Sequence, residues 1–288
     1  MCPQARYFPI GVAPLKMVAG LSRHGVDYGQ GAADQQFFQR DERRAAYLAA
    51  KRRAPDDRRG SFGADAAASL ARSAALLWMH DTLAREQPEV LAEVRADGGA
   101  SDGFDALARN VQEDFAVLAA GDECEGRTVA LDVRFPSGWR PERLAGASFA
   151  ALHRPVPGFM ASQAAVQSMV RAMIERGPYV RFVWTLCTND ELDQHPDVRP
   201  AADWARAARL YLRVERQITV PLPAAYAAVF LIRTYVYPCA ELTYAQRKIV
   251  AHALAVMPPE VRAYKGLPQL DEVQHVLLGA RAMETSAV

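Results

Sequence analysis

The stretch RLYLRVERQITVPLPAAYAAVFLIRTYVY, residues 209–237, decides the fold class. Apolar and polar residues alternate through residues 209–222, and a period of two predicts a β-strand. Residues 227–237 are predicted to form a second strand. The two runs are separated by PAAY, residues 223–226. A connection this short predicts an antiparallel hairpin.

The first strand of this hairpin has a face that is polar apart from one tyrosine ring, made by Tyr211, Arg213, Glu215 and Gln217. Such a face is common where an antiparallel sheet meets water. It also suits the wall of a pocket, in which Arg213 and Glu215 would bind or orient a substrate. On the second strand Arg233 shares an otherwise apolar face, and a buried guanidinium needs a partner. The predicted partner is Glu215, and Arg181 on another predicted strand poses the same question.

The remaining periodicity places helices on both sides of the strands in sequence. Strands are predicted at residues 127–135 and 179–187, and helices at residues 34–50, 65–95, 107–119, 162–176, 244–256 and 270–283. In the second helix the predicted buried stripe is Leu70, Ala74, Leu77 and Trp78. This order predicts an α+β fold. We expect one domain over residues 34–270, after an irregular segment at residues 1–33 and before a C-terminal helix and tail at residues 271–288.

Composition excludes several classes of protein. The 288 residues carry a net charge of +1, which offers no electrostatic footprint for nucleic acid or an anionic membrane. No apolar run reaches the ~18 residues of a membrane helix, and the N-terminus does not resemble a signal peptide. The four cysteines are scattered without a CxxC pair, which argues against zinc, iron–sulfur clusters and disulfides. We therefore expect a cytoplasmic protein.

A second stretch, FPSGWRPERLAGASFAALHRPVPGF at residues 135–159, predicts a strand end, a turn, a loop and a short strand. His153 is followed there by Arg154 and two prolines, which fix the backbone beside it. Three roles are open for this ring: a structural histidine, a catalytic base and a metal ligand. The six histidines form no HxH or HExxH pair. One fixed histidine suits a haem iron, which needs a single protein ligand, and a hydrogen-bonded structural histidine remains the alternative.

Several motifs together resemble one family. VQEDFAVL, FPSGWRPERLAG, LHRPVPGF, RVERQITVPLP, FLIRTYVYP and YKGLP occur in this order. They resemble the haem-dependent oxidative N-demethylase family, and in particular its haem-binding alpha-type subunit. The resemblance implies a PAS-like antiparallel sheet flanked by helices that binds haem b. It also implies use of dioxygen to oxidise a small amine to a smaller amine and formaldehyde, with electrons from a separate flavin and iron–sulfur partner.

The same resemblance implies roles for individual residues. His153 would be the axial iron ligand, and the cofactor would also contact Trp139, Arg140, Arg143 and Arg154, with the arginines pairing with haem propionates. Arg213 would donate hydrogen bonds to the dioxygen, and Glu215 would hold the substrate ammonium or accept its proton. The expected substrate contacts are Tyr211, Gln217, Arg233 and Trp184.

Three departures from the family pattern leave the substrate open. Val183 stands where an asparagine usually precedes the tryptophan, RLAG replaces the expected lysine-leucine-glycine, and Ile218 replaces a threonine. A divergent member could instead carry out N-oxygenation or dehydrogenation of an amine in a natural-product pathway. Two further classes are a haem-based gas sensor, which would need an output domain that is not evident here, and an interaction subunit that has lost haem.

Overall fold

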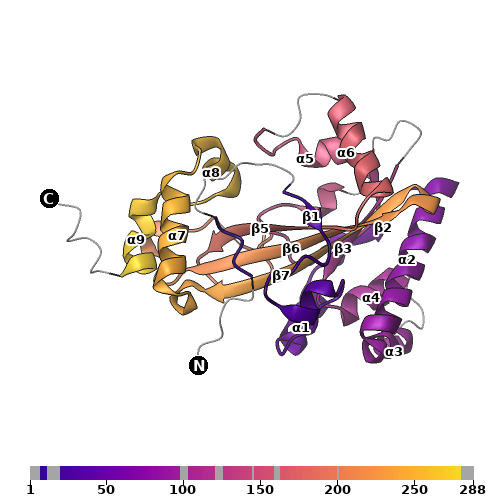
Figure 1. Cartoon of the computed structure of the whole chain (residues 1–288), viewed down its shortest axis with the longest axis horizontal. Helices are drawn as coiled ribbons and strands as arrows, with labels where there is room; N and C mark the ends of the chain where they lie inside the picture. The colour runs from indigo at the N-terminus through magenta and orange to yellow at the C-terminus, as the bar shows by residue number, and fades with distance from the viewer. Residues whose placement is uncertain are drawn as a thin grey trace.

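The computed structural model describes residues 7–11, 20–97, 103–120, 126–144, 146–158, 163–199 and 201–279. One sheet of seven strands runs through the molecule in the order β1-β5-β6-β7-β3-β4-β2, and each neighbouring pair is antiparallel (Figure 1). The strands are β1 Ser22–Arg23, β2 Arg59–Ser61, β3 Asp114–Ala119, β4 Arg127–Asp132, β5 Tyr179–Cys187, β6 Tyr211–Leu222 and β7 Ala227–Pro238. Helices combined with an antiparallel sheet confirm the α+β class.

The predicted hairpin is formed by β6 and β7. Their pairing runs from Tyr211 opposite Pro238 to Leu222 opposite Ala227, so the strands stay in register over their whole length. A short 3₁₀ turn, Pro223–Ala225, joins them. Tyr226 closes the turn with φ of 47°, in the left-handed region that non-glycine residues seldom adopt. The hairpin thus forms the long axis of the sheet.

Helices cover both faces of the sheet (Figure 1). They are α1 Arg44–Arg53, α2 Ala66–Glu86, α3 Pro88–Asp97, α4 Gly103–Asn110, α5 Phe149–His153, α6 Gln163–Glu175, α7 Tyr244–Ala255, α8 Pro259–Lys265 and α9 Leu270–Leu278. Helices α5 and α6 lie on one side, α1 to α4 lie on the other, and α7 and α9 cover the far end.

We name the two faces of the sheet after the helices that cover them. On the α6 face, Leu118 and Ala228 pack against Val166 and Val170 of α6, and the side chains of Arg213, Glu215 and Gln217 share this face through the alternation along β6. On the α2 face, Val117, Ile218 and Val229 join the main apolar core with the buried side of α2.

Several sequence predictions about helices and strands were wrong. The helix expected at residues 107–119 ends at Asn110, and Asp114–Ala119 forms β3, because this stretch alternates and pairs on both sides with β4 and β7. The short strand expected after the FPSGW turn is helix α5, which begins where the Ser148 side chain accepts a hydrogen bond from the Ala151 N–H. The remaining corrections concern the N-terminal helices.

Residues 65–95 form two helices: α2 ends at Glu86, and Pro88, which cannot continue a helix, begins α3. Leu70 and Leu77 are 53% and 64% exposed, so of the predicted stripe only Ala74 and Trp78 pack against the core. The buried stripe of α2 is instead made of small and flexible side chains at the same helical spacing: Ala68, Ala71, Ala75, Met79 and Leu83. The first helix, expected at residues 34–50, begins only at Arg44.

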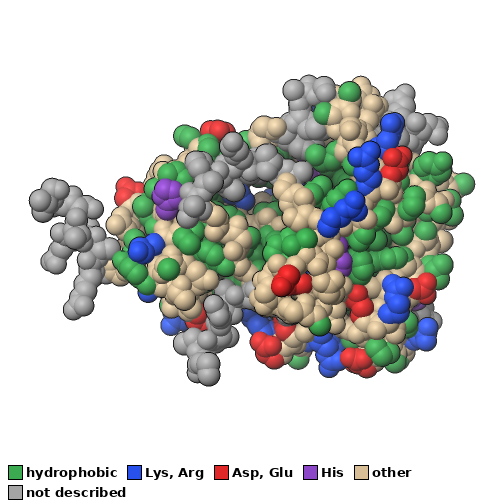
Figure 2. Space-filling view, viewed as in Figure 1, with side chains coloured by type: hydrophobic (Ala, Val, Ile, Leu, Met, Phe, Trp, Pro, Cys, Tyr) green, Lys and Arg blue, Asp and Glu red, His purple; other side chains and the backbone are tan. Residues whose placement is uncertain are grey.

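Two contacts tie the described part of the N-terminal segment to the rest of the molecule. Strand β1 pairs with β5, and the Tyr7 side chain is buried. In the part of the chain that the structure describes, no helix combines the length and hydrophobicity needed to span a membrane. Figure 2 shows acidic and basic side chains interspersed along the edge formed by α1, α3 and α4.

Candidate functional site

A continuous network of polar side chains lies on the α6 face. Arg213 Nε donates to Ser137 Oγ over 2.6 Å, and the Ser137 hydroxyl donates to Glu215 Oε1. Gln217 Nε2 donates to Glu215 Oε2 over 2.7 Å. The Gln217 carbonyl oxygen in turn accepts from Arg181 Nε, also over 2.7 Å. This site network joins three residues of β6, one residue of β5 and one loop residue.

Arg213 is held at the buried end of the site network. Besides Ser137, its guanidinium donates from Nη1 to the Leu192 carbonyl over 2.8 Å and from Nη2 to the Phe135 carbonyl over 2.6 Å. The residue is 1% exposed. Because all three of its nitrogens donate to the protein, Arg213 is suited to fixing the position of Ser137 and Glu215.

Ser137 reaches the network from the loop that follows β4. The Gly138 N–H donates to the Gln194 carbonyl over 3.1 Å, and Ser137 and Gln194 form an isolated parallel bridge. Gly138 has φ of 78°, a left-handed conformation that suits glycine at this turn. The FPSGW motif therefore places a hydroxyl between the Arg213 and Glu215 side chains.

His153 lies at the C-terminal end of α5, and its ring is fixed on two sides. Nδ1 lies 2.9 Å from the Phe149 carbonyl oxygen, and the ring centroid lies 4.1 Å from that of Phe149. Burial lowers the pKa of His153 to about 4, the bond to the Phe149 carbonyl opposes this, and the Arg181 charge lowers it further. At neutral pH the imidazole is therefore uncharged. Since a carbonyl can only accept, Nδ1 carries the proton and Nε2 carries the lone pair.

Two half-buried cations, Arg181 and Lys265, lie near Glu215. Lys265, at the C-terminal end of α8, donates from Nζ to the Trp184 carbonyl over 2.9 Å. Burial lowers the pKa of Lys265 to about 8, which Glu215 opposes and Arg181 reinforces. Burial also lowers the pKa of Arg181, with Glu215 and Tyr264 acting in the opposite direction. The Lys265 ammonium also lies 5.9 Å from the centroid of the Trp184 ring. Glu215 acts on the pKa of both cations, and the Arg181 charge lowers the pKa of both Lys265 and His153, so these groups influence one another electrostatically.

Arg233 lies on the opposite face of the sheet, so the prediction that Glu215 is its partner was wrong. Across the hairpin Arg233 lies opposite Arg216, whereas Glu215 lies opposite Thr234. Arg233 Nη2 pairs with Asp41 Oδ2 at 2.6 Å, and Glu113 lies 3.9 Å from Arg233 Nε. The guanidinium also stacks on the Tyr47 ring at 4.2 Å.

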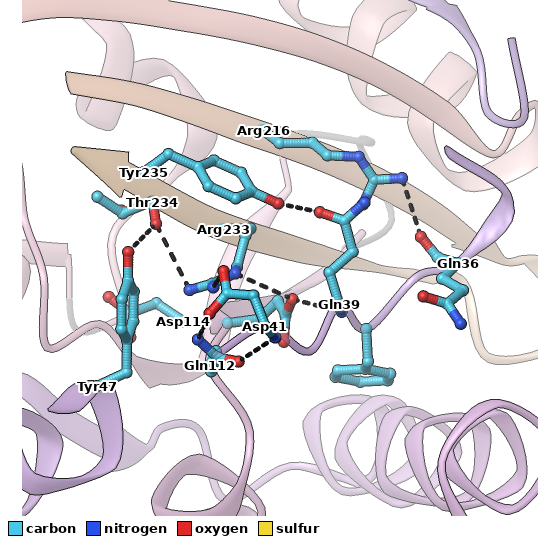
Figure 3. A network of polar contacts seen from close by, with 12 residues as sticks. Gln36, Gln39, Asp41, Tyr47, Gln112, Asp114, Arg216, Arg233, Thr234 and Tyr235 are labelled. Carbon is cyan, nitrogen blue, oxygen red and sulfur yellow. Dashed lines mark hydrogen bonds and ion pairs between the residues drawn. The ribbon is translucent and has the colours of Figure 1, made fainter. Parts of the chain in front are cut away.

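Figure 3 shows this second set of contacts, which we call the α2-face network. Arg216 Nη2 donates to the Gln36 carbonyl over 2.9 Å, and the Tyr235 hydroxyl donates to Gln39. Within the described residues, Arg216 Nε and Nη1 and Arg233 Nε are buried without a hydrogen-bond acceptor. The α2-face network therefore anchors the N-terminal segment to β6 and β7 and takes no part in the site network.

The other expected substrate contacts divide between the two faces. Trp184 pairs with Val214, is 5% exposed and packs among the apolar residues of α7 and α9, away from Glu215. Tyr211 shares the α6 face with Glu215 but lies at the end of β6, against Phe135 and Leu192. Gln217 is thus the expected substrate contact that the structure brings next to Glu215.

The residues expected around haem are also spread out. Trp139 packs against Leu131, Val133 and Ile232, which form a small apolar cluster. Arg143 and Arg154 are exposed. Arg140 forms a two-point ion pair with Asp197, with Nη2 to Oδ1 at 2.5 Å, and so has its guanidinium occupied by the protein.

Glu142, His195 and Asp197 bring one ligand atom each within 4.8 Å of one another, a spacing that could hold a metal ion. His195 Nδ1, however, accepts the Asp197 N–H over 3.1 Å, so Nε2 carries the proton and donates to Glu142 over 3.2 Å. Arg140 pairs with Asp197 as well. These contacts describe a closed ion-pair cluster in which both histidine nitrogens are already used.

The sequence model of the family described as haem-dependent oxidative N-demethylase, alpha subunit-like matches residues 33–275. The chain belongs to this family. The match covers most of the 288 residues and confirms the resemblance drawn from the motifs. It identifies the protein as a haem-dependent oxidoreductase of the N-demethylase-like type.

His153 fits the haem group that the N-demethylase family requires. Ligating histidines usually donate their other ring N–H to a carbonyl or carboxylate, and a histidine must be in its neutral form to bind a metal. The Nδ1 contact with the Phe149 carbonyl and the low pKa of His153 satisfy both conditions. The two cysteines among the described residues, Cys187 and Cys239, are free and buried.

Sequence reasoning missed two members of this neighbourhood and left the partner of a third open. Ser137 belongs to the FPSGW motif, and a hydroxyl beside the glycine of a turn is the feature that could have indicated it. Lys265 lies in YKGLP, where nothing in the spacing connects it to a strand eighty residues earlier in the chain. Arg181 was noted as needing a partner, but its pairing with Gln217 depends on the register between β5 and β6.

Proposed function

We propose that this N-demethylase-family protein uses dioxygen to oxidise a small amine, with His153 as the axial ligand of haem b. Haem supplies the redox chemistry when bound, and the chain supplies position and electrostatic field. The observation that carries the proposal is the state of His153, because an uncharged ring with Nδ1 on the Phe149 carbonyl is what an iron ligand requires.

Glu215 is the proposed binding group for the substrate amine. Its two oxygens accept hydrogen bonds from Ser137 and Gln217, so the carboxylate has a fixed direction. A carboxylate held in this way can bind an ammonium through the remaining lone pairs, or accept a proton from it as oxidation proceeds. Arg213 acts as a positioning residue, since its donors are directed at Ser137 and at two carbonyls.

The substrate pocket would differ from that of typical members of the family. Val183, the residue that replaces the usual asparagine, lies directly opposite Glu215 in the pairing of β5 and β6. An apolar side chain beside the amine-binding carboxylate supports a substrate other than the simplest secondary amine. N-demethylation and a related C–N or N oxidation remain alternatives within this proposal.

The wider setting is also part of the proposal. A PAS-like arrangement is supported by the order of elements, in which α5 and α6 connect the β3–β4 hairpin to the β5–β6–β7 meander within one antiparallel sheet. Arg143 and Arg154 are proposed for the haem propionates, because both are exposed and close in sequence to the turn and to His153. Electrons would come from a separate flavin and iron–sulfur protein in the cytoplasm.

The experiment that tests this function is an absorption spectrum of haem-supplied protein, oxidised and reduced, for the wild type, His153→Ala and His275→Ala. His275 is an exposed residue of α9 and serves as the matched control. We expect a strong Soret band in the wild type and in the control, and a lost or shifted band in His153→Ala with an unchanged circular dichroism spectrum. A Soret band in His153→Ala identical to that of the wild type would exclude this ligand. No band in any sample would exclude the haem function itself.

A further inference from the structure

In the described part of the chain, the half-buried cations Arg181 and Lys265 lack a carboxylate partner, whereas several buried cations have one. Arg58, Arg134 and Lys51 lie 2.6, 2.7 and 3.1 Å from the oxygen atoms of Asp193, Asp132 and Asp114. Within the ranges that the structure describes, no carboxylate oxygen lies within 4.0 Å of Arg181 or Lys265. The charges of these two side chains are therefore not neutralised by an ion pair inside the protein.

Backbone carbonyls do not fully replace the missing carboxylate. Arg262, which also lacks an ion pair, donates to the carbonyls of Leu254, Met257 and Pro268. Arg181, among the described residues, donates from Nε to Gln217, and Lys265 donates to the Trp184 carbonyl. Each cation therefore keeps N–H donors that could bind a further acceptor.

Gln217 indicates how hydrogen-bond donors and acceptors would be arranged in a ligand that binds between Glu215 and Arg181. Its amide donates to Glu215 and accepts from Arg181, each over 2.7 Å, so one small group presents a donor to the anion and an acceptor to the cation. An α-amino acid offers the same polarity on neighbouring atoms, with an amino group as donor and a carboxylate as acceptor. Lys265 lies in the same electrostatic neighbourhood as Glu215 and Arg181.

The electrostatics agree with this geometry. Burial lowers the pKa of both Arg181 and Lys265, and in the case of Lys265 the Arg181 charge lowers it further. An anion that binds beside a partly desolvated cation stabilises its charged form. Arginine with lysine is also a common combination for binding a carboxylate.

We infer that Arg181 and Lys265 bind the carboxylate of an amino-acid substrate, whose amino nitrogen is bound by Glu215. This rests on the proposed function, and it narrows the substrate from a small amine to an N-methylated or otherwise oxidisable α-amino acid. The carboxylate recognised here has one other possible source, a haem propionate, and the experiment below separates the two.

The test is isothermal titration calorimetry of the haem-loaded protein with N-methylglycine and with dimethylamine, which differ by the carboxylate alone. The proteins are the wild type, Arg181→Gln, Lys265→Met and the control Arg171→Gln, which changes an exposed residue of α6. We expect N-methylglycine to bind at least tenfold more tightly than dimethylamine. Arg181→Gln and Lys265→Met should each weaken N-methylglycine binding about tenfold, the usual range for a hydrogen bond to a charged group, and leave dimethylamine unchanged.

Three outcomes would overturn the inference. The first is equal affinity of the wild type for the two compounds. The second is unchanged binding of N-methylglycine in the folded variants. The third is loss of haem, measured by the Soret band, in both variants with no loss of affinity specific to N-methylglycine, which would assign the two cations to the haem propionates. Lys265→Met keeps the test decisive if Arg181→Gln does not fold.

Failure of the haem proposal is distinguishable from failure of this inference. If the wild type shows no Soret band, the haem function fails. Preferential binding of N-methylglycine by the same protein, together with its loss in both variants, would still support the carboxylate site. A Soret band without that preference would leave haem in place and refute the amino-acid substrate.

Discussion

Replacing Lys265 by methionine should stabilise the protein when no ligand is bound. The ammonium of Lys265 is partly desolvated, beside Arg181 and without a carboxylate, and its pKa is lowered from 10.5 to about 8. Below pH 8 the lysine is charged in both the folded and the unfolded protein, and folding then costs the free energy of desolvating that charge. Methionine keeps a similar length and volume and removes the charge.

The shift in pKa sets the size of the effect. At ~1.4 kcal/mol per pKa unit, the lowering of the Lys265 pKa corresponds to roughly 3.5 kcal/mol at most. Lys265 is half-buried, so solvent screening reduces this to about half. Losing the hydrogen bond from Nζ to the Trp184 carbonyl costs about 0.5 kcal/mol. The net stabilisation should be about 1 kcal/mol, which raises Tm by about 2 °C in a protein of this size.

The pH dependence gives the sharper test. Between pH 8 and pH 10.5 the unfolded wild type still binds the proton of Lys265 while the folded protein has released it, so the stability of the wild type rises with pH. The advantage of Lys265→Met should therefore be complete below pH 8 and disappear by about pH 10.5. Thermal unfolding followed by circular dichroism at five pH values from 6 to 10 would measure this.

Lys248→Met, which changes an exposed lysine of α7, is the matched control and should show little difference at any pH. If Lys265→Met is less stable than the wild type at pH 7, or if its advantage does not change with pH, the desolvation argument for Lys265 is incorrect. Saturating N-methylglycine should reverse the order of stability at pH 7, because the ligand binds the folded wild type more tightly.

Three other substitutions probe the two polar networks. Asp41→Asn removes the partner of the buried Arg233 and should lower the free energy of unfolding, measured by urea unfolding, by about 3 kcal/mol. The control Glu89→Gln, which removes an exposed ion pair, should lower it by less than about 0.5 kcal/mol. Similar losses in the two variants would show that the buried Arg233–Asp41 pair stabilises the protein no more than an exposed pair does. Glu215→Gln should lower kcat/KM for the amine about 100-fold with an unchanged Soret band, and unchanged kinetics would remove Glu215 from the site. Ser137→Ala should lower kcat/KM about tenfold, since Glu215 loses a hydrogen bond that fixes its direction; a loss as large as that of Glu215→Gln would show that Ser137 contacts the substrate itself.

Local patterns predicted the strands well. The bounds of β5 agree with the predicted residues 179–187, and the alternation along β6 correctly grouped Arg213, Glu215 and Gln217 on one face. These features depend on the backbone geometry of a single strand, which the pattern of neighbouring residues indicates. The stretch that became β3 was misassigned because VQEDFAVL satisfies a helical period as well as an alternating one.

The relation between strands was not predictable in the same way. Leu222 lies opposite Ala227, so odd-numbered residues of β6 share a face with even-numbered residues of β7. This parity depends on the conformation of the turn, including the left-handed Tyr226, and a change of one residue would reverse it. The error about Arg233 and Glu215 came from this parity. Ser137 and Lys265 come from distant segments, and their positions depend on tertiary packing.

The arginines of the α2-face network have a consequence for how the chain selects its strand pairing. A slip of β6 by one residue would turn Arg216 toward the α6 face and bury Glu215 against the helices beneath the sheet. Arg216 would then lose its hydrogen bond to the Gln36 carbonyl. A slipped register therefore costs free energy on the α2 face, away from the proposed substrate site. The buried arginines of the α2-face network thus help to select the register of β6 that places Glu215 in the site network.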